Sequence, residues 1–325
     1  MLRTEQSYAV TGAGVSCWAG YGTWSEIIRH LADEVAERRQ GEVDPDAIIH
    51  NHQDLLICAQ HLGRELDPAD FGNFIRREFG PNGAAPHDVL YRIAGMPFRH
   101  FITLNFDRSV EDTNASVGLS CGTISGCDRR SIASFVREMD CSDYPRKVVH
   151  VHGTFLDSPD EIALTEHGYT LLYRDNQLFK QFLWLLAAAK RLVFLGFGFE
   201  DSDFLNSLRD ASRDIRDNGL CHFAIVPIEA NVEDAPIRNQ LNQRYLIEPI
   251  FYELLGDDRN RYDGFVGLIN GISGALGIPE RNRDEGPVPV IREEPPSVPE
   301  DVHKAAELGD ALLDRIDPRG DDVPA

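Results

Sequence analysis

The sequence lacks any long apolar run. No window approaches the roughly 18 consecutive apolar residues that a membrane-spanning helix needs, and the first residues do not have the pattern of a signal peptide. Cysteine pairs of the C-x-x-C type are also absent, although six cysteines are scattered along the chain: Cys17, Cys58, Cys121, Cys127, Cys141 and Cys221. Scattered thiols are most often reduced and structural in the cytoplasm. We therefore expect a cytoplasmic protein with no membrane partner and no metal site.

Basic side chains are in short supply as well. Lys and Arg number 32 against 53 Asp and Glu, which gives a formal net charge of -21. A broad attraction to nucleic acid phosphates or to an anionic membrane is therefore disfavoured, although a local basic patch is still compatible with this balance. Apolar residues make up 42% of the 325 residues, which is enough for a full core. We expect a globular protein that does not bind nucleic acid directly.

Short apolar runs of strand length recur along the chain, and most end in Gly, Asn, Asp or Pro. They are SYAVTG (7–12), RHFITLNFD (99–107), RKVVHVHG (146–153), RLVFLGFG (191–198), CHFAIVPI (221–228) and LIEPIFYE (246–253). Helical patterns lie between them, as at 171–191 and 201–215. This alternation predicts an α/β fold, a Rossmann-like parallel sheet of about six strands with helices on both faces. Ligands of such sheets bind at the carboxyl ends of the strands.

Two stretches break the alternation. The interval 23–97 contains amphipathic helical windows but no strand, which predicts an all-helical subdomain inserted into a Rossmann-fold domain made of 1–22 and 98–278. Residues 279–325 form a Pro-rich acidic tail with a short amphipathic helix near its end, at 302–316. The tail cannot bury enough apolar surface to fold alone. Its composition fits either a disordered terminus or a segment that docks on another subunit.

The first candidate site is the turn GAGVS at 12–16. Gly12 and Gly14 follow a predicted strand and open a helix, where backbone N–H groups and the helix dipole can hold a pyrophosphate. The dehydrogenase fingerprint G-x-G-x-x-G fails because Cys17 occupies the third glycine position, and no clear acid follows after about 20 residues. Hydride transfer is therefore disfavoured. The turn alone fits a nucleotide site or a tight corner.

Polar side chains stand at the ends of two further strands. Asn105 and Asp107 in TLNFD lie where ligands bind, although the same pair could simply cap the next helix. In VVHVHG, His150 and His152 share a face of the strand, and His152 stands at its end beside a glycine. Whether His150 assists His152 or only packs is left open. LGFGFEDSDF (195–204) is another glycine-containing strand exit, whose acids could cap a helix.

In this order, the motifs GAGVS, T-x-N-x-D, strand-terminal H-G and G-F-G followed by D-x-D resemble the sirtuin (SIR2) fold. They are most similar to the bacterial SIR2-like NAD-cleaving domains of antiphage defence systems. The resemblance spans residues 8 to about 206 and includes LTEHGYTLLYRDNQLFKQFLWLL (164–186), which is similar to a helix pair of the defence branch. It implies that NAD⁺ is the substrate and that the NAD pyrophosphate, its ribose and the adenosine half are bound by Gly12, Ala13, Gly14, Ser16, Gly196 and Gly198.

The resemblance also implies catalytic roles. Asn105 would position the nicotinamide ribose or the attacking water, Asp107 would contact the nicotinamide side, and His152 would act as general base. The chain departs from protein-deacylating sirtuins, because it lacks their four-cysteine zinc module and has GYGTW where they carry G-I-P-x-F-R. Cleavage of the nicotinamide glycosidic bond by water is therefore the simpler reaction. It needs an oriented nucleophile and a base such as histidine, but no metal.

We therefore expect an NAD⁺ glycohydrolase (NADase) that acts as the toxic effector of an antiphage defence system, by abortive infection. The family commonly forms homo-oligomers, and chains of this size resemble the SIR2 partners of HerA-like ATPases or of short Argonaute proteins. Activity would then be gated by oligomerisation or by a partner. Two other functions are compatible with the motifs. One is an NAD-dependent protein deacylase or ADP-ribosyltransferase, and the other is a non-catalytic module that binds NAD or ADP-ribose.

Overall fold

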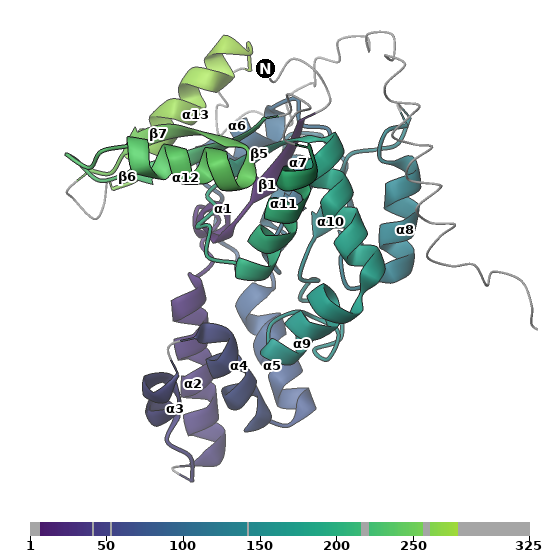
Figure 1. The fold of residues 1–325 in the computed structure, drawn as a ribbon. Coiled ribbons are helices and arrows are strands. Elements are labelled where there is room, and N and C mark those ends of the chain that lie inside the picture. The colour runs from purple at the N-terminus through teal and green to yellow at the C-terminus, as the bar shows by residue number, and fades with distance from the viewer. Residues whose placement is uncertain are drawn as a thin grey trace, which may run out of the picture.

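The computed structural model describes residues 7–40, 42–52, 54–141, 143–215, 221–255 and 261–278. At its centre lies a seven-stranded sheet in the order β3-β4-β2-β1-β5-β6-β7 (Figure 1). Its strands are β1 (Ser7–Thr11), β2 (Phe101–Thr103), β3 (Gly122–Ser125), β4 (Lys147–His150), β5 (Arg191–Leu195), β6 (His222–Ile228) and β7 (Ile247–Glu253). The predicted tail at 279–325, including the helix expected at 302–316, lies outside the described residues.

Every pair of neighbouring strands in this sheet runs parallel. The central strand β1 pairs with β2 on one side and with β5 on the other, so that Ala9 lies between Phe101 and Val193. The predicted α/β class and the predicted strands are confirmed. A seventh strand, β3, was not predicted. The chain builds β2, β3 and β4 on one side of β1 and then crosses over to build β5, β6 and β7 on the other.

Helices cover both faces of the sheet because the strands alternate their side chains. Tyr8 and Val10 of β1 point into one apolar layer and Ala9 points into the other. The first layer is packed by α8 (Arg129–Glu138), α10 (Gln177–Ala189), α11 (Ser202–Ile215) and α12 (Ala235–Tyr245). The second is packed by α1 (Ala13–Cys17), α6 (Asp88–Gly95), α7 (Ser109–Ser116) and α13 (Asp263–Ala275).

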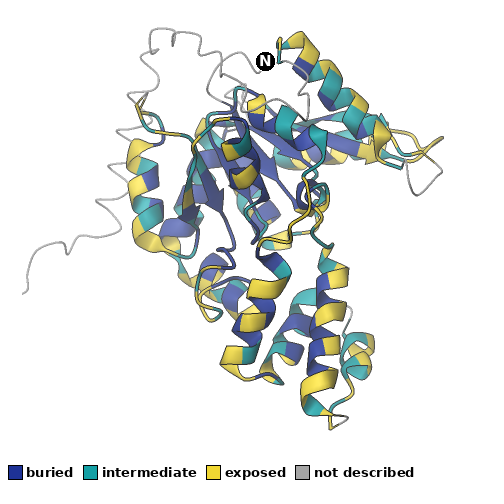
Figure 2. Cartoon of the chain, turned by 180° about the vertical axis from the view of Figure 1, so that it is seen from behind, coloured by how far each residue is buried: buried dark blue, intermediate teal, exposed yellow. Residues whose placement is uncertain are grey.

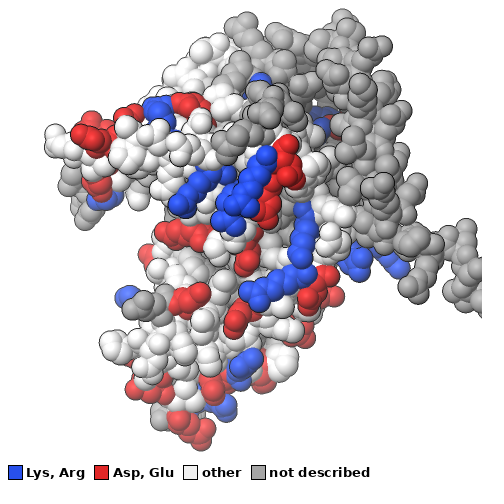
Figure 3. All heavy atoms as spheres, in the orientation of Figure 1, with Lys and Arg blue, Asp and Glu red and all other residues white. Residues whose placement is uncertain are grey.

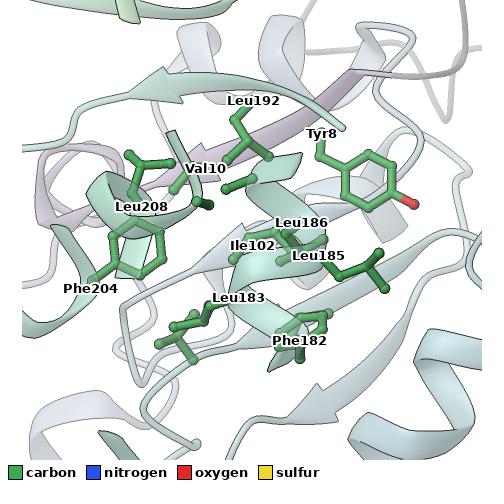
Figure 4. Packing of buried hydrophobic residues seen from close by; sticks show 14 of the residues in the cluster. Tyr8, Val10, Ile102, Phe182, Leu183, Leu185, Leu186, Leu192, Phe204 and Leu208 are labelled. Carbon is green, nitrogen blue, oxygen red and sulfur yellow. The ribbon is translucent and has the colours of Figure 1, made fainter. Parts of the chain in front are cut away.

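Burial follows this layering. The strands and the helix surfaces that face them are buried, while the outward helix surfaces are exposed (Figure 2). Figure 4 shows the first layer from close by, where Leu183 and Leu186 of α10 and Leu208 of α11 lie against the sheet. Two of its large side chains, Phe182 and Phe194, are at most 1% exposed. The core therefore lies on both sides of β1 and holds the carboxyl ends of the central strands rigidly.

A group of helices lies beyond the carboxyl edge of the sheet (Figure 1). It consists of α2 (Trp24–Arg39), α3 (Pro45–Asn51), α4 (Leu55–Arg64) and α5 (Pro68–Phe79). Their apolar faces share one cluster, which also includes Phe106 and Phe155 from the sheet edge. By contrast, α6 packs against the sheet. The division of the chain into domains at 22, 97 and 278 stays a prediction.

The described surface carries both signs of charge. On the face seen in Figure 3, acidic and basic side chains are interspersed over the described residues. Oppositely charged side chains pair in places, as Arg38 does with the partly exposed Asp70 and the buried Glu34. Within the described ranges, no helix has the length and apolar character needed to cross a membrane.

Candidate active site

The glycine turn after β1 packs directly on the exit of β5. The N–H of Gly12 donates to the carbonyl of Leu195 at 3.2 Å, and the N–H of Gly14 donates to the carbonyl of Gly196 at 3.0 Å. Gly196 has a φ of +55°, and a Cβ there would lie 2.6 Å from the backbone nitrogen of Val15. Small residues are needed because two backbones touch. The turn is therefore a tight corner in which the N–H groups of Gly12 and Gly14 donate to protein carbonyls, and pyrophosphate binding at this turn stays a prediction.

The other predicted binding positions surround this corner. Ala13 begins α1 and is exposed, as is Gly198 at the β5 exit. A Cβ on Gly198 would meet nothing nearer than 3.7 Å, so this glycine is not required by packing. Ser16, one turn into α1, is only 3% exposed and points inward. The short helix thus presents one open and one buried position to the sheet edge.

Asn105 and Asp107 meet Ser16 across the sheet edge. The amide of Asn105 donates to the Oγ of Ser16 at 2.7 Å and to the carbonyl of Gly12 at 2.8 Å. The hydroxyl of Ser16 in turn donates to Oδ2 of Asp107 at 2.6 Å. The other carboxylate oxygen of Asp107 accepts the N–H of Ser109 at 2.9 Å, at the start of α7. Asp107 was predicted either to cap the next helix or to face a ligand. Its carboxylate supports the start of α7 and also faces the glycine turn.

His152 follows β4 and lies beside the same residues. Its Nδ1 is 3.1 Å from the carbonyl of Leu104, which directly precedes Asn105, so Nδ1 carries the proton. Its Nε2 lies 3.0 Å from the Tyr173 hydroxyl and 3.1 Å from Oδ2 of Asp201. The His152 side chain is 5% exposed. The structure therefore brings together the strand-end residues Asn105, Asp107 and His152, with both ring nitrogens of His152 in contact with the protein.

Three of the groups around His152 were not among the predicted site residues. Asp201 was predicted only to cap a helix, and it does, since its Oδ1 accepts the N–H of Phe204 at 2.8 Å. Tyr169 comes from α9 (Glu166–Tyr169) and Tyr173 from the π-helix η1 (Thr170–Asp175). Tyr169 donates to Oδ2 of Asp201 at 3.0 Å. Their spacing of four residues, on a helical segment inside the recognised 164–186 stretch, is the signal that could have revealed the tyrosines.

Charge is concentrated on Asp201 in this cluster. Burial alone would raise the pKa of Asp201, but the hydrogen bond and charge of His152, together with the N–H of Phe204 and the Tyr169 hydroxyl, lower it. Burial and then the charge of Asp201 raise the pKa values of Tyr169 and Tyr173 well above the ordinary value of 10.0. Asp201 is therefore a carboxylate at neutral pH, and both tyrosines are hydrogen-bond donors.

His150 lies behind the site. Its Nδ1 is 2.8 Å from the carbonyl of Asn105, and its Nε2 is 2.9 Å from Oε1 of Glu111. Burial would lower the pKa of His150, but the hydrogen bond and charge of Glu111 outweigh it and raise that pKa. The partner effect lowers the pKa of Glu111 despite its burial. The side chain of His150 is 0% exposed, so it packs and anchors the Asn105 backbone rather than facing a ligand.

Among the described residues, no group of three or more His, Cys, Asp and Glu side chains is arranged to hold a metal ion. All six cysteines are free. Burial raises the pKa values of Cys121 and Cys127 to about 12, so these thiols stay protonated and unreactive.

Comparisons with known proteins show what the chain is similar to. Residues 99–250 match the SIR2-like domain family. The resemblance expected from the motifs is thereby confirmed. The chain is also 25% identical over 266 residues to the protein named NAD(+) hydrolase ThsA from Cytobacillus dafuensis. The aligned part covers 81% of this chain and 46% of that protein, so the chain spans about half the length of this curated relative.

The SIR2-like region contains Asn105, Asp107, His152 and Gly196, and also Asp201 and both tyrosines. The glycine turn at 12–16 precedes the matched residues and joins them through the contacts of Ser16 and Gly14. The site is therefore composed of a SIR2-like part and an N-terminal strand and turn that pack into its middle.

Proposed function

We propose that this chain is an NAD⁺ glycohydrolase, which cleaves NAD⁺ with water to nicotinamide and ADP-ribose. The observation that carries the proposal is the meeting of Ser16, Asn105, Asp107 and His152 at the carboxyl edge beside β1. This is the point where the strand order reverses, and ligands of open α/β sheets bind there. The similarity to a protein named NAD(+) hydrolase supports the same substrate.

The proposed reaction balances with a single base. The bond between the ribose C1′ and the nicotinamide nitrogen breaks, and its electron pair goes to the nitrogen, which loses its positive charge. A water oxygen bonds to C1′, and the water proton passes first to His152 and then to solvent. Because the leaving group is already cationic, the protein has chiefly to stabilise the electron-poor sugar and orient the water.

Each site residue has a separate role in the proposed reaction, which follows from its contacts. Nε2 of His152 is the atom that takes the proton, since Nδ1 already donates to the Leu104 carbonyl. For this transfer the attacking water replaces the Tyr173 hydroxyl as the hydrogen-bond partner of Nε2. Asn105 offers an amide that can orient water or a ribose hydroxyl without acting as a nucleophile. The carboxylate of Asp107 supplies negative charge near the developing cation. Ser16, which touches both Asn105 and Asp107, keeps these two side chains in register.

The test is to incubate the purified protein with NAD⁺ and to quantify nicotinamide and ADP-ribose by chromatography. We expect release by the wild type and a loss of at least about a hundredfold in Asn105→Ala and His152→Ala. Binding of NAD⁺ to each variant is measured by calorimetry. Bound but intact NAD⁺ in the wild type would instead support a non-catalytic module. Release only when an acylated peptide is added would support a deacylase or transferase.

The wider biological part of the proposal is an effector of antiphage defence. The motif resemblance to SIR2-like defence domains supports this role in the cytoplasm, within a homo-oligomer and with a HerA-like ATPase or short Argonaute partner. The burial of Ser16, Asp107 and His152, each at most 4% exposed, supports gating, because a dinucleotide reaches them only after the protein moves. Expression in a bacterial host should lower NAD⁺ and protect a culture against phage, and His152→Ala should abolish both effects.

A further inference from the structure

Asp201 is fixed in place by groups from three different elements. Its Oδ1 accepts the N–H of Phe204 in the first turn of α11. Its Oδ2 accepts the hydroxyl of Tyr169 at 3.0 Å and lies 3.1 Å from Nε2 of His152. The side chain is 10% exposed. A carboxylate held by so many contacts has little freedom to move away from the histidine, so its charge acts on the ring at a constant distance.

The ring of His152 is oriented by the same arrangement. The Leu104 carbonyl accepts a hydrogen bond from the protonated Nδ1. This leaves Nε2 facing Asp201 and the Tyr173 hydroxyl. When the ring is neutral, Nε2 accepts a hydrogen bond from Tyr173. When the ring is protonated, Nε2 donates to the carboxylate of Asp201. Both protonation states therefore have a partner without any change in the orientation of the ring.

We propose that Asp201 is a positioning residue that holds the His152 ring and stabilises the imidazolium formed when this ring takes the proton of the attacking water. The inference rests on the proposed function, since it assigns the device that makes His152 an effective base. A fixed carboxylate beside a histidine favours the charged ring, because the two opposite charges attract across a poorly solvated contact. Stabilising the protonated ring, which forms as the proton is transferred, lowers the barrier to the hydrolytic step.

Other charged and titratable groups near His152 are few. Tyr173 and Tyr169 face it from η1 and α9 and stay protonated. Asp203, in the first turn of α11, interacts with His152 through charge alone. The nearby positive charge of Arg174 partly balances the charge of Asp203. Asp203 is therefore a second carboxylate of the same D-x-D motif that does not touch the ring nitrogen. It provides a matched control for Asp201.

The experiment compares Asp201→Asn with Asp203→Asn. An asparagine at 201 keeps an oxygen for the cap of α11 but replaces the second oxygen with an amide and removes the charge. For Asp201→Asn we expect kcat to fall about ten- to a hundredfold with KM changed less than about threefold. The low-pH limb of its activity profile should move to lower pH, because the protonated ring has lost its partner. Asp203→Asn should change all three quantities much less than Asp201→Asn does, because Asp203 does not contact the ring nitrogen.

A second readout does not depend on turnover. The imidazole signal of His152, identified by its absence in His152→Ala, is followed by NMR as pH is varied. We expect its transition to move to lower pH in Asp201→Asn and also in Asp201→Ser, which keeps a capping oxygen. Coincident transitions in these variants and the wild type would overturn the proposal. If the wild type releases no nicotinamide but the transition moves, the proposed hydrolase fails while the pairing of Asp201 with His152 stands.

Discussion

At the scale of single residues, His150 and Glu111 form a buried pair of titratable side chains. Each group stabilises the charge of the other, and Thr123 adds a hydrogen bond to the same Glu111 oxygen at 2.7 Å. The second oxygen of Glu111 is buried with no partner in the described structure. Removing one member of a buried pair is costly because the other charge is left uncompensated. The pair therefore contributes to stability chiefly while both groups are charged.

This pair predicts a particular dependence of stability on pH. The pKa of Glu111 is below its ordinary 4.5, so its contribution is present above pH 4.5 and is lost as pH falls through the lowered value. The pKa of His150 is above its ordinary 6.5, so its contribution is complete below pH 6.5 and is lost as pH rises through the raised value. Both contributions are complete between pH 4.5 and 6.5.

We expect Glu111→Gln to lower the free energy of unfolding by about 3 kcal/mol at pH 6. The difference from the wild type should shrink in alkaline solution, where His150 loses its charge. Denaturant unfolding at pH 6 and pH 9 measures both values. Glu37→Gln removes an exposed carboxylate of α2 and should change little at either pH. A loss for Glu111→Gln that is equal at the two pH values would show that packing, rather than charge, accounts for it.

At the scale of elements, the contact between the turn after β1 and the exit of β5 fixes the glycine edge of the site. We expect Gly196→Ala to lower the free energy of unfolding by at least about 2 kcal/mol, because its Cβ would lie 2.6 Å from a backbone nitrogen and its φ is +55°. Gly198→Ala, two residues later, should cost less than about 0.5 kcal/mol, because its Cβ would meet only the Glu200 side chain at 3.7 Å or more. Thermal unfolding of both variants tests this, and equal losses would contradict it.

The elements also show what the sequence can and cannot predict. The buried central strands are apolar runs, so β1 and β5 were predictable. The four residues of β3 are partly exposed and include Gly and polar side chains, so they lack any such run. Within the predicted helical interval 23–97, α3 ends at Asn51 and α4 begins at Leu55, because Asp54 caps a new helix. Helical periodicity alone does not reveal such a break.

The same limit applies to the candidate site. Asn105, Asp107 and His152 were predictable because each stands at the end of an apolar strand beside a recognisable motif. The contact of Asp201 with His152 was not, since its local role as a helix cap accounts fully for an acid at that position. Only the packing of α9, η1 and α11 around β4 and β5 brings the carboxylate to the ring.

At the scale of the whole molecule, the site lies where the helices α2 to α5 meet the sheet. Phe79 of α5 packs against Phe106 with ring centroids 4.9 Å apart, and Phe106 lies between Asn105 and Asp107 in the chain. Gln60 of α4 accepts the N–H of His167 at 3.0 Å, on the helix that carries Tyr169. Movement of the helices α2 to α5 would therefore displace Phe106 on one side of His152 and the helix that carries Tyr169 on the other.

We expect NAD⁺ to change hydrogen exchange at this junction. In His152→Ala, which should bind NAD⁺ without turnover, the exchange of residues 79–87, 104–107 and 166–175 should change on binding. The helix α13 at the opposite end of the sheet should be unaffected and serves as the internal control. Mass spectrometry of proteolytic fragments gives the comparison. Changes confined to β6, β7 and α13 would place the nucleotide elsewhere.

The central position of β1 has a consequence for how the protein is made. This five-residue strand is synthesised before its two neighbours, which end at Thr103 and Leu195. Parallel partners so far apart in sequence are slow to meet, because long segments must be ordered before the contacts form. Asp201 follows later still. A nascent or prematurely terminated chain that ends before this point therefore holds the glycine turn, Asn105 and His152 without the residues that assemble them, so translation must pass residue 201 before the site can exist.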